Sequence, residues 1–310
     1  MKSTAFAHAK PPVGADMRVG SNRYQRQRLL IGTLFAIPAV ILLVVLVIYP
    51  VGLSIYYSFF RYNLLMPDKM SFIGFKNFID ILKNDAFYNA LRNTIYFTLV
   101  VVPIQTAVAL GLALLVNIPS KVKNLFRVGF FSPVVTSLVV ISILWSMLYS
   151  SGGMINGVLK LFGIPPQPFL TSADQAMNSI IFMSIWQSAG YYMMIFLAGL
   201  QEIPTELYEA AKVDGAGAFQ RFWNVTLPGL SHVTRFVITV TTIGCFKLFQ
   251  QPYIMTKGGP SGSTMSVVQF IYEQGVQNRN AGYASAITVV FLIIIILVTL
   301  LLQKIKYGER

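Results

Sequence analysis

Apolar residues along the chain gather into six long runs, which polar and mostly basic segments separate. Each run approaches the roughly 20 residues that an α-helix needs to cross the hydrocarbon core of a bilayer. Backbone groups in hydrocarbon must be hydrogen-bonded inside the protein, and runs of this length achieve that as helices rather than as barrel strands. The pattern therefore predicts an all-α integral membrane protein with six transmembrane helices, at residues 29–49, 94–116, 128–149, 177–200, 235–254 and 283–302.

Prolines lie inside the first three of these runs, at Pro38, Pro103 and Pro133. Membrane helices tolerate proline because neighbouring helices and side chains satisfy the backbone groups that it frees. We therefore expect local kinks at these three positions rather than a gate.

The composition agrees with a membrane protein. Of the 310 residues, 55% are hydrophobic and 11% are charged, whereas soluble domains carry about 25% charged residues. The formal net charge is +13, but the basic residues lie mostly between the apolar runs, where the positive-inside rule explains them better than nucleic-acid binding does. We expect contact with membrane lipid and none with nucleic acid.

Lysine and arginine are divided unevenly between alternate loops, and this predicts the orientation. Segments 1–28, 117–127, 201–235 and 303–310 hold about 15 of them, against about 8 on the opposite side. Both termini and the 201–235 loop are therefore expected in the cytoplasm. The predicted parts are a basic tail at 1–28, a transmembrane domain at 29–302 and a second tail at 303–310. The first run is long enough to span, so no cleaved signal peptide is expected.

Chemistry that other transporters and enzymes need is missing. All 11 aspartates and glutamates fall outside the six runs, whereas a proton-coupled transporter places a titratable group within the membrane. No phosphate-binding loop is present, and the glycine-rich stretch 258–264, which lacks the required lysine, is expected to be a turn. With two histidines, His8 and His232, and one cysteine, Cys245, we expect no catalytic residue and no metal site.

One charged side chain, Lys247, lies within an apolar run. A lysine at the centre of a membrane helix costs about 2.5–3.5 kcal/mol on insertion scales. We therefore expect Lys247 to snorkel to the interface or to face a wet cavity.

A polar loop at 201–230 separates the fourth and fifth runs. Thr205 is a candidate N-cap, and Glu206 in the first turn suits the positive end of a helix. Gly215 can adopt the left-handed conformation that ends a helix. A second short helix is expected near 219–223, with Leu227-Pro228 ending it.

The first of these short helices carries one compact face, at i, i+3 and i+4 spacing: Leu207, Ala210 and Ala211. Such a face can dock a partner. The alternative is an interfacial hairpin that rests Phe219, Phe222 and Trp223 on lipid.

The spacing of residues in this loop resembles the EAA loop of ABC-importer permeases. That pattern is Glu-Ala-Ala, three residues, Gly, nine residues and Ile-x-Leu-Pro, and every fixed position matches except that Val225 replaces Ile. The resemblance implies a coupling helix that inserts into a groove of an ATPase subunit. The residues expected to carry the coupling are Glu209, Ala210, Ala211, Asp214, Gly215, Leu227 and Pro228.

Further segments resemble the carbohydrate-uptake permeases of the maltose, lactose and glycerol-phosphate group. They are residues 72–78, 85–94, 253–260 with Ser263-Thr264, and 282–286. One departure is Phe249-Gln250, where many relatives have Phe-Asp. The neutral amide puts in doubt any substrate contact inferred from relatives at that position.

Together these resemblances imply a type I ABC-importer permease fold in the bacterial inner (plasma) membrane. The chain would form half of a transmembrane path for a sugar or oligosaccharide that an extracytoplasmic binding protein delivers. Its partners would be a second homologous permease and two ATPase subunits, which hold ATP and Mg²⁺, so that this chain carries no cofactor and is not an enzyme.

A sugar path needs aromatic faces together with amides or hydroxyls. Candidates in the outer halves of the fourth and fifth runs are Trp186, Gln187, Tyr191, Lys247, Gln250 and Tyr253. On a continuous helix, Lys247, Gln250 and Ile254 would share one stripe. Ordinary packing or an interfacial aromatic belt is the alternative for each aromatic residue.

Three other functions remain to be compared with this one. A permease for an amino acid or polyamine would lack the carbohydrate-type external segments. A secondary transporter or channel would leave the EAA spacing unexplained, and a membrane enzyme would lack a catalytic set.

Overall fold

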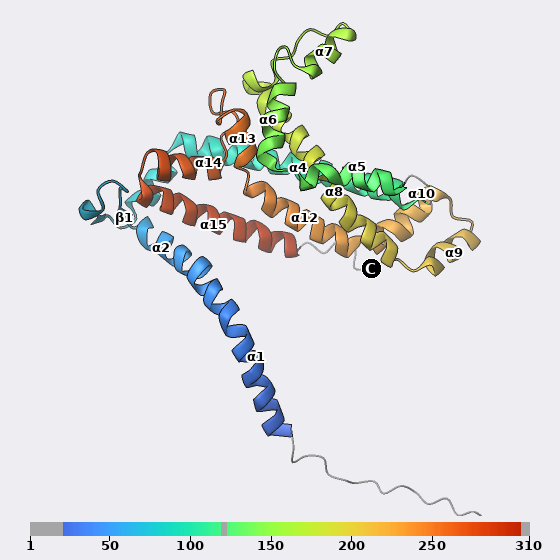
Figure 1. Cartoon of the computed structure of the whole chain (residues 1–310), viewed down its shortest axis with the longest axis horizontal. Coiled ribbons are helices and arrows are strands. Elements are labelled where there is room, and N and C mark those ends of the chain that lie inside the picture. Colours follow the sequence, from blue (N-terminus) through green and yellow to red (C-terminus); the bar gives the residue numbers. More distant parts are fainter. Residues whose placement is uncertain (1–20, 119–122, 305–310) are drawn as a thin grey trace, which may run out of the picture. The chain divides into compact units, whose positions relative to one another are not determined.

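The computed structural model describes residues 21–118 and 123–304 and is mostly helical (Figure 1). The chain divides into two compact units, Met1–Leu53 and Ser54–Arg310. Most of each predicted tail lies outside the described residues. The first helix begins at Ser21, so the predicted boundary at residue 28 falls inside it.

The first unit contains one apolar helical stretch. It consists of α1 (Ser21–Leu43), the π-helical turn η1 (Val44–Ile48) and the start of α2 (Tyr49–Ser58). The apolar candidate span covers Ile31–Ser58, so it ends nine residues beyond the predicted end at 49. Pro38 lies inside α1, which continues through it.

The second unit contains the remaining helices and one small sheet. Strands β1 (Phe60–Arg61) and β2 (Ser71–Phe72) pair antiparallel, with Phe60 opposite Phe72. The helices, in chain order, are α3 (Lys76–Leu82), α4 (Asp85–Asn117), α5 (Lys123–Val135), α6 (Leu138–Leu148), α7 (Met154–Leu161), α8 (Ala173–Glu202), α9 (Thr205–Val213), α10 (Ala218–Arg221), η4 (Phe222–Thr226), α11 (Leu227–Gly229), α12 (Ser231–Phe246), α13 (Gln250–Met255), α14 (Val267–Tyr272), η5 (Glu273–Gln277) and α15 (Ala281–Lys304). Short 3₁₀ turns, η2 (Pro67–Lys69) and η3 (Phe169–Thr171), lie in the connections.

Within the described residues, four helical stretches are long and apolar enough to cross a membrane: Ile31–Ser58, α4, α8 and α15. The bent pair α5 and α6 makes a fifth if the two helices form one broken span. The predicted spans at 94–116, 177–200 and 283–302 lie within α4, α8 and α15.

The predicted third span, 128–149, is broken rather than kinked. Its two halves meet at an angle of 99°. Pro133 has no N–H for the Gly129 carbonyl one turn earlier, and the Ser132 hydroxyl donates to that carbonyl instead, at 3.1 Å. Ser137 has an extended backbone, with ψ at 127°, and α6 starts after it.

The predicted fifth span, 235–254, is also interrupted. Helix α12 has 16 residues and ends at Phe246. Its last turn is closed by hydrogen bonds to the carbonyl three residues earlier. They run from Lys247 N to the Gly244 carbonyl (3.0 Å) and from Leu248 N to the Cys245 carbonyl (3.1 Å). Lys247 therefore does not belong to the predicted stripe, because it lies in the break, whereas Gln250 and Ile254 do share one side of α13.

Helix α8 is the centre of the second unit. It packs against α4, α5, α6 and α12, and its buried side chains belong to two apolar clusters, one around Ile180 and Met183 and one around Met193 and Phe196. Gly190 lets α5 approach closely, since a Cβ there would collide with the Phe130 carbonyl oxygen. Small residues allow such close approach between membrane helices.

The glycine-rich stretch 258–264 forms a turn, as predicted. Two asparagines near the start of α4 hold it: the side-chain amides of Asn89 and Asn93 both donate to the Gly262 carbonyl at 2.8 Å. Asn93 also donates to the Met265 carbonyl at 3.0 Å. The connection between α13 and α14 is thereby attached to α4.

Replacing Gly190 by Ala should destabilise the folded chain, because overpacking of a close contact costs about 1–3 kcal/mol. Gly111→Ala is the matched control, since a Cβ at Gly111 meets nothing within 4 Å. Thermal unfolding in detergent can be followed with a thiol-reactive dye, because the single cysteine, Cys245, is buried. Equal unfolding temperatures for the two variants would contradict the predicted helix contact.

Candidate functional site

The loop at 201–230 forms two short helical segments. Helix α9 ends in a Schellman motif: Ala216 N donates to the Ala211 carbonyl (2.8 Å) and Gly215 N donates to the Lys212 carbonyl (3.0 Å). Gly215 has a φ of +76°, as predicted for a glycine cap. Thr205 is not the N-cap, because α9 begins one residue earlier than expected, with Pro204 in that position and no capping side chain.

The second segment is longer than predicted. It runs from Ala218 through the π-helical turn η4 to Gly229. Its last helical residue is Gly229, one residue after Leu227-Pro228. The Gln220 side chain accepts from Gly217 N at 2.9 Å and fixes the start of the segment.

The two segments are joined by a hydrogen bond between the Tyr208 and Thr226 hydroxyls, at 2.9 Å. Thr226 is buried. Tyr208 and Val225 pack against the apolar cluster around Met193 and Phe196. The loop is therefore a preformed hairpin.

Helix α9 has no buried residue. Val213 is 88% exposed and Phe219 is 74% exposed, and Leu207 and Trp223 are also exposed. Of the predicted coupling residues, Glu209, Ala210, Asp214, Gly215 and Pro228 are exposed, while Ala211 and Leu227 are half-buried. The hairpin thus presents an apolar surface with acidic groups beside it.

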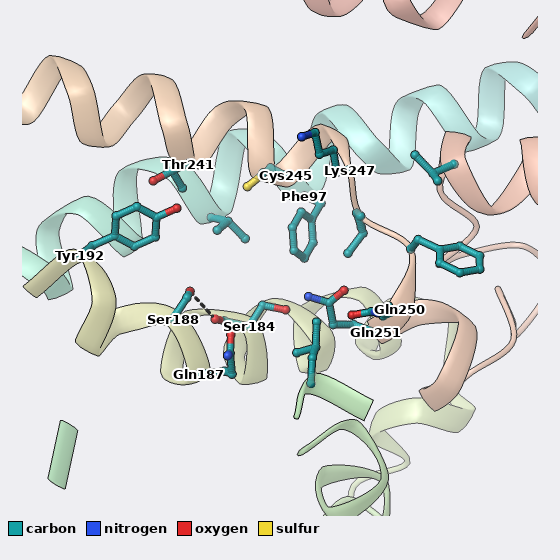
Figure 2. Close-up of a pocket in the computed structure, with 16 residues that line it drawn as sticks. Phe97, Ser184, Gln187, Ser188, Tyr192, Thr241, Cys245, Lys247, Gln250 and Gln251 are labelled. Carbon is teal, nitrogen blue, oxygen red and sulfur yellow. Dashed lines mark hydrogen bonds between the residues drawn. The ribbon is translucent and has the colours of Figure 1, made fainter. Parts of the chain in front are cut away.

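A second feature is a polar cavity of about 480 Å³ that is partly open. Figure 2 shows residues of its walls, which come mainly from α4, from α8, from α12 with the break after it, and from α13. The polar lining residues are Ser184, Gln187, Ser188, Tyr192, Thr241, Lys247, Gln250 and Gln251. Phe97, Val101, Leu138, Leu248, Phe249 and Val268 supply apolar wall.

Amides and hydroxyls supply the neutral polar groups of this lining, and among the described residues the one charged lining residue is Lys247. The side chain of Gln187 also donates to the Pro133 carbonyl at 3.5 Å, beside the break between α5 and α6. Within the part of the chain that the structure describes, no group of three or more His, Cys, Asp or Glu side chains could hold a metal ion.

A buried amide supports one wall of the cavity. Gln105 of α4 is fully buried, and its side-chain oxygen lies 3.0 Å from the Ser188 hydroxyl. The same hydroxyl lies 2.7 Å from the Ser184 carbonyl. Ser188 has one proton for these two acceptors, and its oxygen lone pairs can accept a further hydrogen bond.

The structure brings together three of the six predicted path residues, Gln187, Lys247 and Gln250. Trp186 lies elsewhere: it lines an apolar groove of about 850 Å³ on another side of α8. Its ring packs 5.3 Å from that of Trp145. One residue along a helix turns the side chain by about 100°, which separates Trp186 from Gln187.

The two predicted tyrosines also lie outside the cavity lining. Tyr191 is exposed, with its ring 5.2 Å from that of Tyr192. Tyr253 stacks on Phe249 at 5.2 Å and meets Tyr272 at 5.4 Å. A hydrogen bond with Tyr253 raises the pKa of the Tyr272 phenol above its ordinary value.

Several lining residues were not predicted. Ser184 lies three residues before Gln187 and four before Ser188, so the three share one side of α8, and that periodicity is a signal that identifies the two serines. Gln251 carries no comparable signal, because the break after α12 decides which face of α13 meets the cavity. Thr241 lies in α12 before that break and has no predicted path residue three or four positions away.

Residues 81–306 match the family "Binding-protein-dependent transport system inner membrane component". Curated relatives cover nearly the whole chain. The probable ABC transporter permease protein YurN of Bacillus subtilis is 35% identical over 92% of this chain and 99% of its own length. The arabinooligosaccharides transport system permease protein AraP of the same organism is 33% identical, over 88% of this chain and 87% of its own. The lactose transport system permease protein LacF of Rhizobium radiobacter is 35% identical, over 90% and 94%.

A solved structure has the same fold. One chain of a bacterial alginate ABC transporter, crystallised with an alginate pentasaccharide-bound periplasmic protein, superposes with a TM-score of 0.78 at 21% identity. The match covers 90% of this chain and 94% of that one. The expected resemblance to importer permeases is confirmed, and the chain belongs to the family of binding-protein-dependent transport system inner membrane components.

Proposed function

We propose that this chain is one of two homologous permease subunits of an ATP-driven importer, and that its cavity forms part of the path for a sugar or oligosaccharide. The observation that carries the proposal is a cavity between the helices of a binding-protein-dependent permease, lined by amides and hydroxyls together with aromatic and aliphatic side chains. Two curated relatives are named for arabinooligosaccharide and lactose transport, which supports a saccharide cargo.

The cavity has the chemistry that a sugar needs. Its volume of about 480 Å³ falls in the range of small-molecule sites. Gln187 and Gln250 offer both donors and acceptors to sugar hydroxyls. Phe97, Tyr192 and Phe249 offer aromatic rings to the apolar faces of the sugar.

The hairpin at 201–230 is the proposed coupling element. Its preformed shape and its exposed apolar side chains, Leu207, Val213 and Phe219, suit insertion into a groove of a separate ATPase. ATP and Mg²⁺ then belong to that subunit. The carboxylate Glu209, on α9, is available to a basic groove, whereas a lipid-resting hairpin would place it in the headgroup region.

Six crossings follow if the bent pair α5–α6 is one span and α12 with α13 is another. The division of lysine and arginine between the loops then places both termini and the coupling hairpin in the cytoplasm. A second permease would close the open side of the cavity, and an extracytoplasmic binding protein would deliver the cargo.

Gly215→Val should uncouple ATP hydrolysis from uptake. A β-branched residue at a φ of +76° is strained by about 1–2 kcal/mol, which would loosen the end of α9. We expect sugar uptake per ATP hydrolysed, measured in proteoliposomes, to fall by about tenfold, the factor that corresponds to 1.4 kcal/mol. Gly215→Asn, which tolerates this backbone, and Gly217→Ala, where φ is −66°, should retain coupling. Normal coupling in Gly215→Val would contradict the proposal.

Gln187→Leu should lower sugar uptake by about tenfold, since a lost hydrogen bond costs about 0.5–1.5 kcal/mol and an unpaired cargo hydroxyl costs more. Trp186→Phe is the matched control, one residue away on the other side of α8. Equal uptake by the two variants, at equal unfolding temperatures, would place the path elsewhere.

Gentle extraction from the native membrane should co-purify a second permease and an ATPase with this chain. The coupling of ATP hydrolysis to uptake by that sample should depend on Gly215. A chain that purifies alone, yet transports in vesicles without an ATPase, would favour a secondary transporter instead.

A further inference from the structure

We propose that Lys247 makes the cavity selective for anionic saccharides, meaning sugars that carry a carboxylate, sulfonate or phosphate group. The inference rests on the proposed function and deepens it, since it names the class of cargo. It follows from the charge inventory of the cavity and from the way the chain holds Lys247 there.

Among the described residues that line it, the cavity has a cation and no counter-charge. No Asp, Glu or His is among its lining residues. The carboxylates of the described residues lie near the start of the chain's second unit, at the start of α8, in the coupling hairpin and in η5: Asp68, Asp80, Asp85, Asp174, Glu202, Glu206, Glu209, Asp214 and Glu273. Across residues 21–118 and 123–304, the Lys247 ammonium has no hydrogen bond or ion pair.

The break after α12 places Lys247 at this wall. Its neighbours Phe246 and Leu248 are buried, at 4% and 3% exposure, whereas Lys247 is exposed. The Ser266 hydroxyl donates to the Leu248 carbonyl at 2.6 Å and anchors the interruption. The position of Lys247 is therefore set by buried groups on both sides, which distinguishes it from a lysine on a free surface.

The charge matters because the cavity is bounded by apolar helices. Two unit charges interact several-fold more strongly beside protein than in bulk water, since the effective dielectric constant falls from about 80 to about 20. A saccharide with a carboxylate would gain this attraction in addition to the hydrogen bonds of Gln187 and Gln250. An amino sugar would meet repulsion, and nothing in the lining offsets it.

Charge-selective labelling of a cavity cysteine tests the potential directly. In a Cys245→Ala background, Gly244→Cys introduces a thiol into the cavity wall, where a Cβ meets nothing within 4 Å. The assembled complex is treated with anionic and cationic methanethiosulfonates of similar size. Both reagents react with the ionised thiolate. The ratio of the anionic to the cationic labelling rate is therefore unaffected by a change in the fraction of the thiol that is ionised. Gln250→Cys repeats the measurement from α13.

We expect Lys247→Gln to lower the anionic-to-cationic rate ratio by about tenfold at both cysteines, the size of effect that one nearby charge produces at an intermediate dielectric constant. Lys257→Gln is the matched control, because Lys257 is exposed and does not line the cavity. An unchanged ratio in Lys247→Gln would overturn the proposal.

Cargo class is tested by protection of the same cysteine from a neutral thiol reagent. Digalacturonic acid should slow labelling at least several-fold more than its neutral dimethyl ester, and Lys247→Gln should abolish the difference. Equal protection by acid and ester with Lys247 intact would overturn the selectivity. ATP-driven sugar uptake with no dependence on Lys247 would refute this inference alone, whereas charge-dependent labelling without any ATP-driven uptake would refute the proposed function.

Discussion

A peptide group that enters hydrocarbon must find its hydrogen-bond partner within the protein, and the second unit is organised around the two places where a helix does not provide one. At the break between α5 and α6, the Ser132 hydroxyl donates a hydrogen bond to the Gly129 carbonyl, and the Gln187 amide donates one to the Pro133 carbonyl. At the break after α12, the Ser266 hydroxyl donates a hydrogen bond to the Leu248 carbonyl. Irregular backbone at membrane depth is tolerated where it is buried or lines a cavity. Both breaks border the polar cavity, through Leu138 and through Lys247–Gln251.

Helix α8 connects these features. One face brings Ser184, Gln187 and Ser188 to the cavity, while Trp186 turns to an apolar groove. Gly190 permits contact with α5, and Gln105 supports Ser188 from α4. A polar side chain in hydrocarbon is expensive. Neighbouring helices and the cavity meet part of that cost here, while the Gln105 side-chain nitrogen has no hydrogen-bond partner among the described residues.

The hairpin at 201–230 is shaped by contacts within its own segment, unlike the cavity. Its shape is set locally, by the end of α9 at Gly215 and by the bond between Tyr208 and Thr226. Its apolar side chains remain exposed because no part of the described chain covers them. The hairpin is thus shaped before any partner arrives, which is the property that a coupling element requires, while the cavity depends on helices far apart in the sequence.

The sequence by itself determined the apolar lengths of α4, α8 and α15, the cap at Gly215 and the membership of a permease family, because each depends on residues close together along the chain or on a spaced motif. It also pointed to Gln187, Lys247 and Gln250. Only the tertiary structure decided that Trp186, Tyr191 and Tyr253 lie outside the cavity and that Thr241 and Gln251 line it. The physical reason is that periodicity defines the faces of a helix but not their neighbours. A break such as the one at Lys247 resets the face for every residue after it, and distant groups such as Ser266 stabilise that break.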